Sequence, residues 1–122
     1  MEKKAKITLK TVEEVIKYEI SIELKNNKIN YVENDPNNTN VLLDLDNKIL
    51  IRDNKELYLE YDFSNNNGII YLKELKNNIN VNLNTIKYEV SDKKIEIMYK
   101  IDENSYEYFI EMEWSLWVLL KV

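Results

Sequence analysis

Apolar and polar residues alternate along most of this chain, and clusters of Asn and Asp interrupt the alternation at intervals of roughly eight to twelve positions. The alternation is clearest in residues 15–25 and 94–101. Because successive side chains of a strand point to opposite faces, this pattern predicts strands with one buried face and one solvated face. No segment before residue 114 shows helical spacing of apolar residues over two full turns, so we expect almost no helix.

The Asn and Asp clusters divide the chain into about ten short strand segments. These are residues 6–12, 15–25, 28–33, 41–44, 48–52, 56–63, 69–75, 79–84 with residues 85–90 either continuing or bending that strand, 94–101 and 106–114. Asn tolerates the left-handed backbone conformation of tight hairpins. Asn26 and Asn27, for example, are expected to turn the chain in the way that Gly does elsewhere, since the chain contains one Gly and one Pro.

Strands joined by short turns, with no long crossover segment, leave a β-sandwich or an up-and-down β-barrel as the sensible architectures. Closure removes the exposed strand edges that promote aggregation, so we expect an antiparallel barrel of about eight to ten strands. A barrel of this size admits interior side chains or one small ligand. The 122 residues are expected to form a single domain, residues 1–122.

The composition narrows the chemistry available to this protein. His and Cys are absent, which excludes Ser-His-Asp and Cys-His catalysis, disulfides and thiolate metal sites; we expect no cofactor and no metal ion. The net charge of −5 disfavours nucleic acid as a partner. The apolar run 116–120 is too short to span a bilayer and no export signal is visible, so we expect a cytoplasmic protein that does not bind membranes.

The order of several segments resembles that of the YwiB-like proteins, a family of uncharacterised bacterial proteins. The segments that carry the resemblance are residues 31–33, 49–52, 61–63, 71, the strand ending at 85, and 95–99, within roughly residues 5–114. This resemblance implies a calycin-type, lipocalin-like β-barrel and a bacterial cytoplasmic setting. It implies no catalytic residues, because the family carries no established activity.

Arg52 is the only arginine of the chain, and it lies late in an apolar strand on the same side as Leu50. Its planar guanidinium could bind a carboxylate or a phosphate inside the barrel, with Tyr31, Tyr88 or Tyr99 supplying hydrogen bonds and ring faces. The structural alternative is an Arg that closes one end of the barrel by pairing with Glu33 or by capping strand carbonyls. Most of the nine tyrosines are expected to pack in the core and at the rim.

Two carboxylate pairs invite a functional interpretation that their surroundings disfavour. Glu111 and Glu113 share one face of the last strand, but the opposite face is the apolar one, so these glutamates are expected in solvent and not in a catalytic site. Asp44 and Asp46 begin like a calcium loop, but the required Gly is absent. We interpret them as part of a hairpin turn.

Residues 115–122 form an apolar C-terminal tail that the barrel does not need. The tail either covers an open barrel end or presents Trp117 and Leu120 to a protein partner or to a second copy of the chain. Two hypotheses for the function follow. The first is a non-catalytic binding module for a small apolar or weakly anionic ligand near Arg52, and the second is a packed interaction domain that dimerises or binds a partner through the tail. An enzyme ranks third, because only carboxylates, Lys and Tyr remain as acids or bases.

Overall fold

The computed structural model describes residues 2–33 and 35–112, and every regular element in these ranges is a β-strand. The ten strands are β1 (Glu2–Lys10), β2 (Val15–Lys25), β3 (Lys28–Val32), β4 (Asn40–Asp44), β5 (Ile49–Asp53), β6 (Leu57–Asp62), β7 (Asn67–Leu72), β8 (Asn77–Val90), β9 (Lys94–Ile101) and β10 (Asn104–Met112). The predicted bounds of β2 and β9 are confirmed, and the remaining strands begin or end a few residues from their predicted positions.

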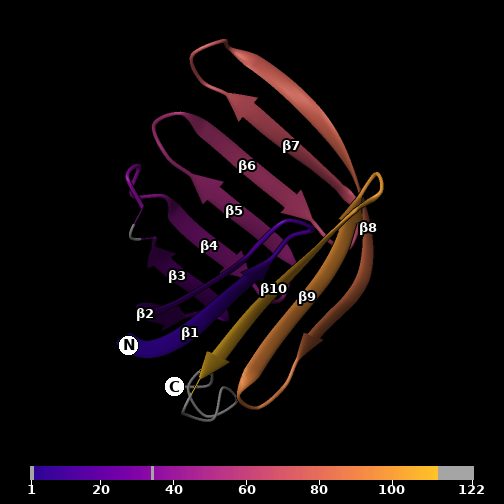
Figure 1. Ribbon diagram of the computed structural model, residues 1–122. Helices are drawn as coiled ribbons and strands as arrows, with labels where there is room; N and C mark the ends of the chain where they lie inside the picture. The colour runs from indigo at the N-terminus through magenta and orange to yellow at the C-terminus, as the bar shows by residue number, and fades with distance from the viewer. Residues whose placement is uncertain (1, 34, 113–122) are drawn as a thin grey trace.

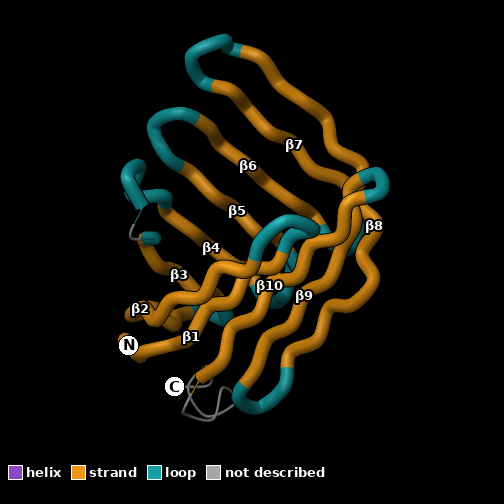
Figure 2. The backbone as a smooth tube through the Cα atoms, in the orientation of Figure 1, coloured by secondary structure: helices purple, strands orange, loops and turns teal. Residues whose placement is uncertain are grey.

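Each strand pairs antiparallel with its neighbours in the chain, and β1 also pairs with β10, which closes the barrel (Figures 1 and 2). The predicted all-β, up-and-down barrel is therefore confirmed, as is the expectation of almost no helix for the described residues. In Figure 1, β4 to β7 form the wall behind β1, β9 and β10, and β8 runs from one wall to the other.

The long strand β8 turns this corner through a β-bulge. Its pairing with β9 shifts register between Thr85 and Lys87, so of the two alternatives for residues 85–90, continuing or bending the strand, the strand both continues and bends. Buried or partly buried positions fall on Val81 and Leu83 before the bulge and on Tyr88 after it, so the inward-facing phase changes by one residue. A bulge bends a strand and increases its twist, which lets one strand belong to both walls.

Asn residues make the tight turns, as the sequence predicts. Asn26 and Asn27 have φ angles of 53° and 60°, and Asn66 and Asp102 adopt similar values of 56° and 54°. Positive φ values at both central residues are typical of the two-residue hairpin turn that matches the twist of the flanking strands. Asn thus replaces Gly at the first three of these positions, and Asp does so at the fourth.

The inward-facing side chains form one continuous apolar core. The most deeply buried of the large side chains are Ile7, Ile22, Ile29, Val41, Leu43, Ile95, Ile97 and Ile110. On β10 the even positions Tyr108, Ile110 and Met112 are buried while Glu111 is exposed, which confirms the predicted phase of this strand. The aliphatic core side chains fill one part of the barrel interior. Polar inward-facing side chains lie in another part of it.

Candidate functional site

A cavity of about 200 Å³ lies among the inward-facing residues of β1, β5, β6, β9 and β10. Its wall and rim consist of Leu9, Lys10, Thr11, Leu50, Arg52, Leu59, Tyr61, Tyr99, Tyr106, Glu107 and Tyr108. Three leucines and four tyrosines dominate this lining, so the cavity is mainly apolar with phenol groups. Lys10 and Glu107 form a partly exposed ion pair at 3.6 Å on the neighbouring strands β1 and β10.

The charged centre of the site is the ion pair between Arg52 on β5 and Glu33, which directly follows β3. Arg52 Nη2 donates to both Glu33 carboxylate oxygens at 2.7 Å. Between these strands, Val41 pairs with Tyr31 on one side and with Arg52 on the other, which brings the ends of β3 and β5 to the same level of the barrel. The Glu33 side chain is 10% exposed and the Arg52 side chain 34% exposed.

Glu33 occupies only one of the three guanidinium nitrogens. Arg52 Nε is buried without a hydrogen-bond partner among the described residues, and Nη1 makes no hydrogen bond to them either. The site therefore retains donor groups on a cation that reaches the cavity wall. Because Nε is closed to solvent, an acceptor bound in the cavity would have to use Arg52 donors other than Nε.

Tyrosines surround the ion pair. The Tyr31 and Tyr108 hydroxyls form a hydrogen bond to each other, and the Tyr18 hydroxyl is buried without a partner in the described part of the chain. At the cavity, the rings of Tyr99 and Tyr106 stack with centroids 5.3 Å apart. Tyr18, Tyr31, Tyr99 and Tyr108 all lie close enough to Arg52 to feel its charge.

Burial keeps these phenols neutral. It raises the pKa of the Tyr31, Tyr99 and Tyr108 hydroxyls well above the ordinary value for tyrosine. Burial also raises the pKa of the Glu33 carboxyl, and the nearby Arg52 guanidinium offsets this only in part. At neutral pH these tyrosine hydroxyls are therefore protonated and can both donate and accept hydrogen bonds.

Tyr61 borders the cavity because its cross-strand neighbour is a glycine. Tyr61 on β6 pairs directly with Gly68 on β7, and a Cβ atom at Gly68 would lie 2.5 Å from the Tyr61 ring. The ring also meets Tyr99 edge to face, with centroids 5.8 Å apart. The single glycine of the chain thus makes room for a wall of the cavity.

The structure brings together some of the predicted site residues and separates others. Arg52 and Tyr99 line the cavity, and Tyr31 lies behind the lining, bonded to Tyr108. Tyr88 packs against Phe63, which lies between it and Tyr99, and the Tyr88 hydroxyl donates to the Leu45 carbonyl at 3.4 Å. The pairing of Arg52 with Glu33, which was the structural alternative, is also present. Arg52 therefore both pairs with Glu33 in the barrel wall and lines the cavity.

Residues 117 and 120, predicted to contact a partner, lie outside the described residues, as does residue 113. Four tyrosines of the site were not among the predicted site residues: Tyr18, Tyr61, Tyr106 and Tyr108. Their inward-facing phase could be predicted from the alternation. The stagger of the strands decides which inward-facing residues share a level, and the local sequence does not reveal this stagger.

The other carboxylates serve turns and surfaces. Asp44 accepts from the backbone and side-chain amides of Asn47, and Asp46 accepts from the Asn27 side chain, which agrees with a hairpin. Within residues 2–33 and 35–112 no group of three or more acidic side chains is arranged to hold a metal ion.

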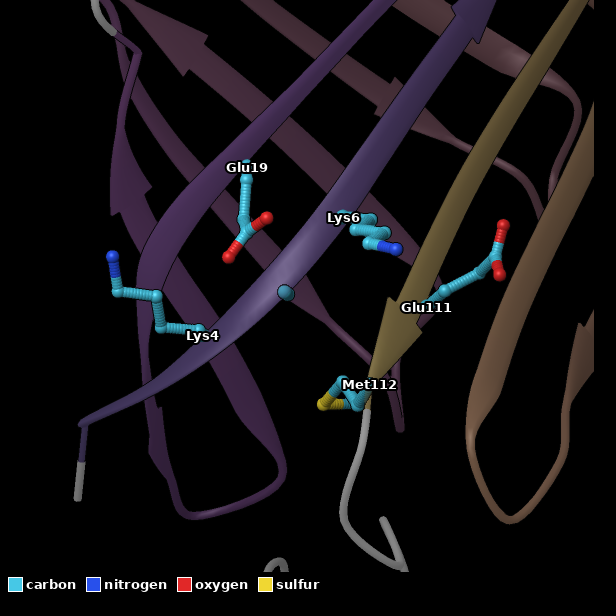
Figure 3. A pocket seen from close by; sticks show the side chains of 6 residues that line it. Lys4, Lys6, Glu19, Glu111 and Met112 are labelled. Atoms are coloured by element: carbon cyan, nitrogen blue, oxygen red, sulfur yellow. The ribbon is translucent and has the colours of Figure 1, made fainter.

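A second hollow, of about 120 Å³, lies at β1, β2 and the end of β10 (Figure 3). Its lining includes Lys4, Lys6, Glu19 and Glu111, which are exposed charged side chains, together with Met112. Figure 3 shows that these charged groups do not converge on one point; Lys4 and Lys6 come from β1, Glu19 from β2 and Glu111 from β10. Among the described residues no buried polar side chain lines this hollow, so we regard the Arg52 cavity as the candidate site.

Comparisons of the chain with protein-family models, with curated proteins and with solved structures find no match. Among the described residues there is no helix long and apolar enough to cross a membrane.

Proposed function

We propose that this protein is a non-catalytic binding module that holds a small apolar or weakly anionic molecule in the barrel cavity at Arg52. The observation that carries the proposal is the cavity itself, which joins an apolar lining to a guanidinium with unoccupied donors. Binding sites for small molecules commonly combine an apolar wall with a few fixed polar groups.

The size of the cavity limits the ligand. A cavity of roughly 150 Å³ holds benzene. The 200 Å³ here accommodates a ring or a short branched chain with one small polar group. The apolar part would contact Leu50 and Leu59, and the polar group would accept hydrogen bonds from Arg52. Neutral tyrosine hydroxyls favour a ligand with an acceptor over a cationic ligand.

Benzoate and its neutral analogue benzyl alcohol test the proposal. In titrations followed by NMR, we expect both probes to shift resonances of residues that line the cavity, with benzoate binding more tightly at a Kd of roughly 0.1 to 1 mM. Leu59→Trp should abolish binding by filling the cavity. Ile69→Trp is the matched control, because Ile69 is exposed on the neighbouring strand and does not line the cavity.

Native mass spectrometry of protein purified from its own cells complements the titration. A retained small molecule on the wild-type protein and on Ile69→Trp, but not on Leu59→Trp, would support the proposal. The proposal fails if neither probe shifts cavity resonances and the purified protein carries no ligand.

We also propose that the chain is related to the YwiB-like proteins and works in a bacterial cytoplasm. The ten-stranded up-and-down barrel supports a calycin-like relationship, and the absence of cysteine from the sequence agrees with a reducing compartment. Fractionation of the native cells with an antibody against the protein tests the location, and recovery from a membrane or secreted fraction would contradict it.

A further inference from the structure

The strand β2 has an edge that no other described strand covers. It is eleven residues long, whereas β3 has five, and the two strands pair only where Glu23–Lys25 meets Lys28–Asn30. Residues 15–22, which we call the β2 edge, pair with β1 on one side alone. The barrel is closed at one end of β2, and its wall is open along the rest of this strand.

The register with β1 identifies the backbone N–H and C=O groups of β2 that do not bond to β1. Thr11 N donates to the Glu14 carbonyl, which fixes the even residues of β2 as those bonded to β1. The odd residues therefore direct their N–H and C=O groups away from β1. At the β2 edge these residues are Val15, Lys17, Glu19 and Ser21, all of them exposed.

Exposed apolar side chains border this edge. Eight large hydrophobic side chains are exposed in the described part of the chain, and four of them lie here: Val12, Val15, Ile16 and Val32. The first three belong to the β1–β2 hairpin. Val32 lies at the end of β3, past the point where β3 stops pairing with β2. An unpaired edge with apolar neighbours is a template for another strand.

We propose that a second copy of this chain docks on the β2 edge, so that the two β2 strands pair antiparallel about a two-fold axis at Tyr18. Such an interface is isologous, since both subunits use the same residues. It places Lys17 opposite the partner's Glu19 and Ile16 opposite the partner's Ile20. Val15 comes to lie opposite the partner's Ser21, so all four outward-directed residues gain backbone hydrogen bonds.

The charges of β2 select this register. Lys17 and Glu19 flank Tyr18 symmetrically, so pairing about Tyr18 joins opposite charges twice. A shift of two residues in either direction places Lys17 opposite the partner's Lys17 or Glu19 opposite the partner's Glu19. A shift of one residue places odd residues of one β2 opposite even residues of the other. The N–H and C=O groups of the even residues already bond to β1, so this register loses its hydrogen bonds. Opposite charges directly across a strand pair stabilise it and like charges destabilise it.

Charge reversal tests the proposal by sedimentation velocity of the full chain over a concentration series. The wild-type protein should dimerise with a Kd below roughly 1 mM. Lys17→Glu and Glu19→Lys should each raise the dimer Kd by roughly tenfold or more, because each creates two like-charge pairs. The double variant Lys17→Glu with Glu19→Lys should restore wild-type dimerisation, since it recreates both opposite-charge pairs.

Lys100→Glu is the matched control. Lys100 is exposed on β9, and its replacement by Glu changes the net charge by the same amount as Lys17→Glu. It should dimerise as the wild-type protein does, and circular dichroism should show the same fold for all variants. A wild-type protein that stays monomeric overturns the proposal. So does a double variant that dimerises no better than the single variants, or a dimer that only Trp117→Asp disrupts.

Discussion

Replacing Glu33 with Gln should lower the stability of the protein and strengthen its binding of anions. Removal of one partner of a fully buried ion pair costs about 3 to 5 kcal/mol, and an exposed pair is worth at most about 1 kcal/mol. The Arg52 side chain is 34% exposed, and burial already penalises the Glu33 carboxylate, as its raised pKa shows. Gln keeps the shape and one acceptor, so we expect a loss of about 1 to 2 kcal/mol in the free energy of unfolding.

The same substitution leaves the charge of Arg52 uncompensated beside the cavity. Removing a repulsive carboxylate about 6 Å from a bound anion is worth about 3 kcal/mol at an effective dielectric constant of 20, and solvent at the open rim reduces this to about 1 to 2 kcal/mol. Glu33→Gln should therefore bind benzoate about tenfold more tightly than the wild-type protein, whereas its affinity for benzyl alcohol should not change.

The assay is an NMR titration with each probe, paired with urea denaturation followed by circular dichroism. Glu33 ionises as the pH rises through its raised pKa, so wild-type affinity for benzenesulfonate, whose own charge stays constant, should increase as the pH falls towards about 4. Glu33→Gln should lack this dependence. Equal gains for benzoate and benzyl alcohol, or no gain for benzoate, would refute the electrostatic reasoning.

Three further predictions concern the scaffold. Gly68→Ala should destabilise the fold by about 1 to 3 kcal/mol and weaken benzoate binding, because the new methyl group meets the Tyr61 ring at 2.5 Å; unchanged urea unfolding would contradict this. Lys76→Gly should raise the free energy of unfolding by about 0.5 kcal/mol, since Lys76 has a φ of 49°, whereas Glu74→Gly, with no positive φ, should lower it. Hydrogen bonds from the Asn65 side chain and nearby amides lower the pKa of Asp62, so its contribution to stability is present above about pH 4 and is lost as the pH falls through the lowered pKa. Asp62→Asn should lose less stability than the wild-type protein in thermal unfolding between about pH 5 and pH 2.

Local patterns predicted the strands well where alternation and turns agree. Residues 15–25 lie between the Thr11–Glu14 turn and Asn26, and both bounds of β2 are as predicted. The start of β1 at Glu2 was missed, because lysines at positions 3 and 4 interrupt the apolar pattern there. Pairing with β2 extends β1 to this point, and that pairing is a long-range property of the barrel.

The candidate site could be predicted from the sequence only because Arg52 is an unusual residue for an apolar strand. Arg52 was visible as a single arginine in an apolar strand, and the structure places it at the cavity. Tyr88 has an inward-facing phase much as Tyr99 does, yet the bulge and the stagger of β8 place it beyond Phe63. Which inward-facing residues meet depends on strand tilt and shear around the whole barrel, so the alternation cannot specify them.

One turn accounts for both the ion pair and the open edge. The Asp35 carboxylate accepts from the Thr39 amide at 2.9 Å and from the Thr39 hydroxyl at 2.8 Å, and Glu33 N donates to the Thr39 carbonyl at 2.8 Å. The chain therefore reverses between Glu33 and Thr39, and Glu33 pairs with Arg52 at this end of the barrel. The same reversal ends β3 after five residues, so it cannot accompany the eleven residues of β2. Residues 15–22 of β2 lie beyond the end of β3, so among the described strands this part of β2 pairs with β1 alone.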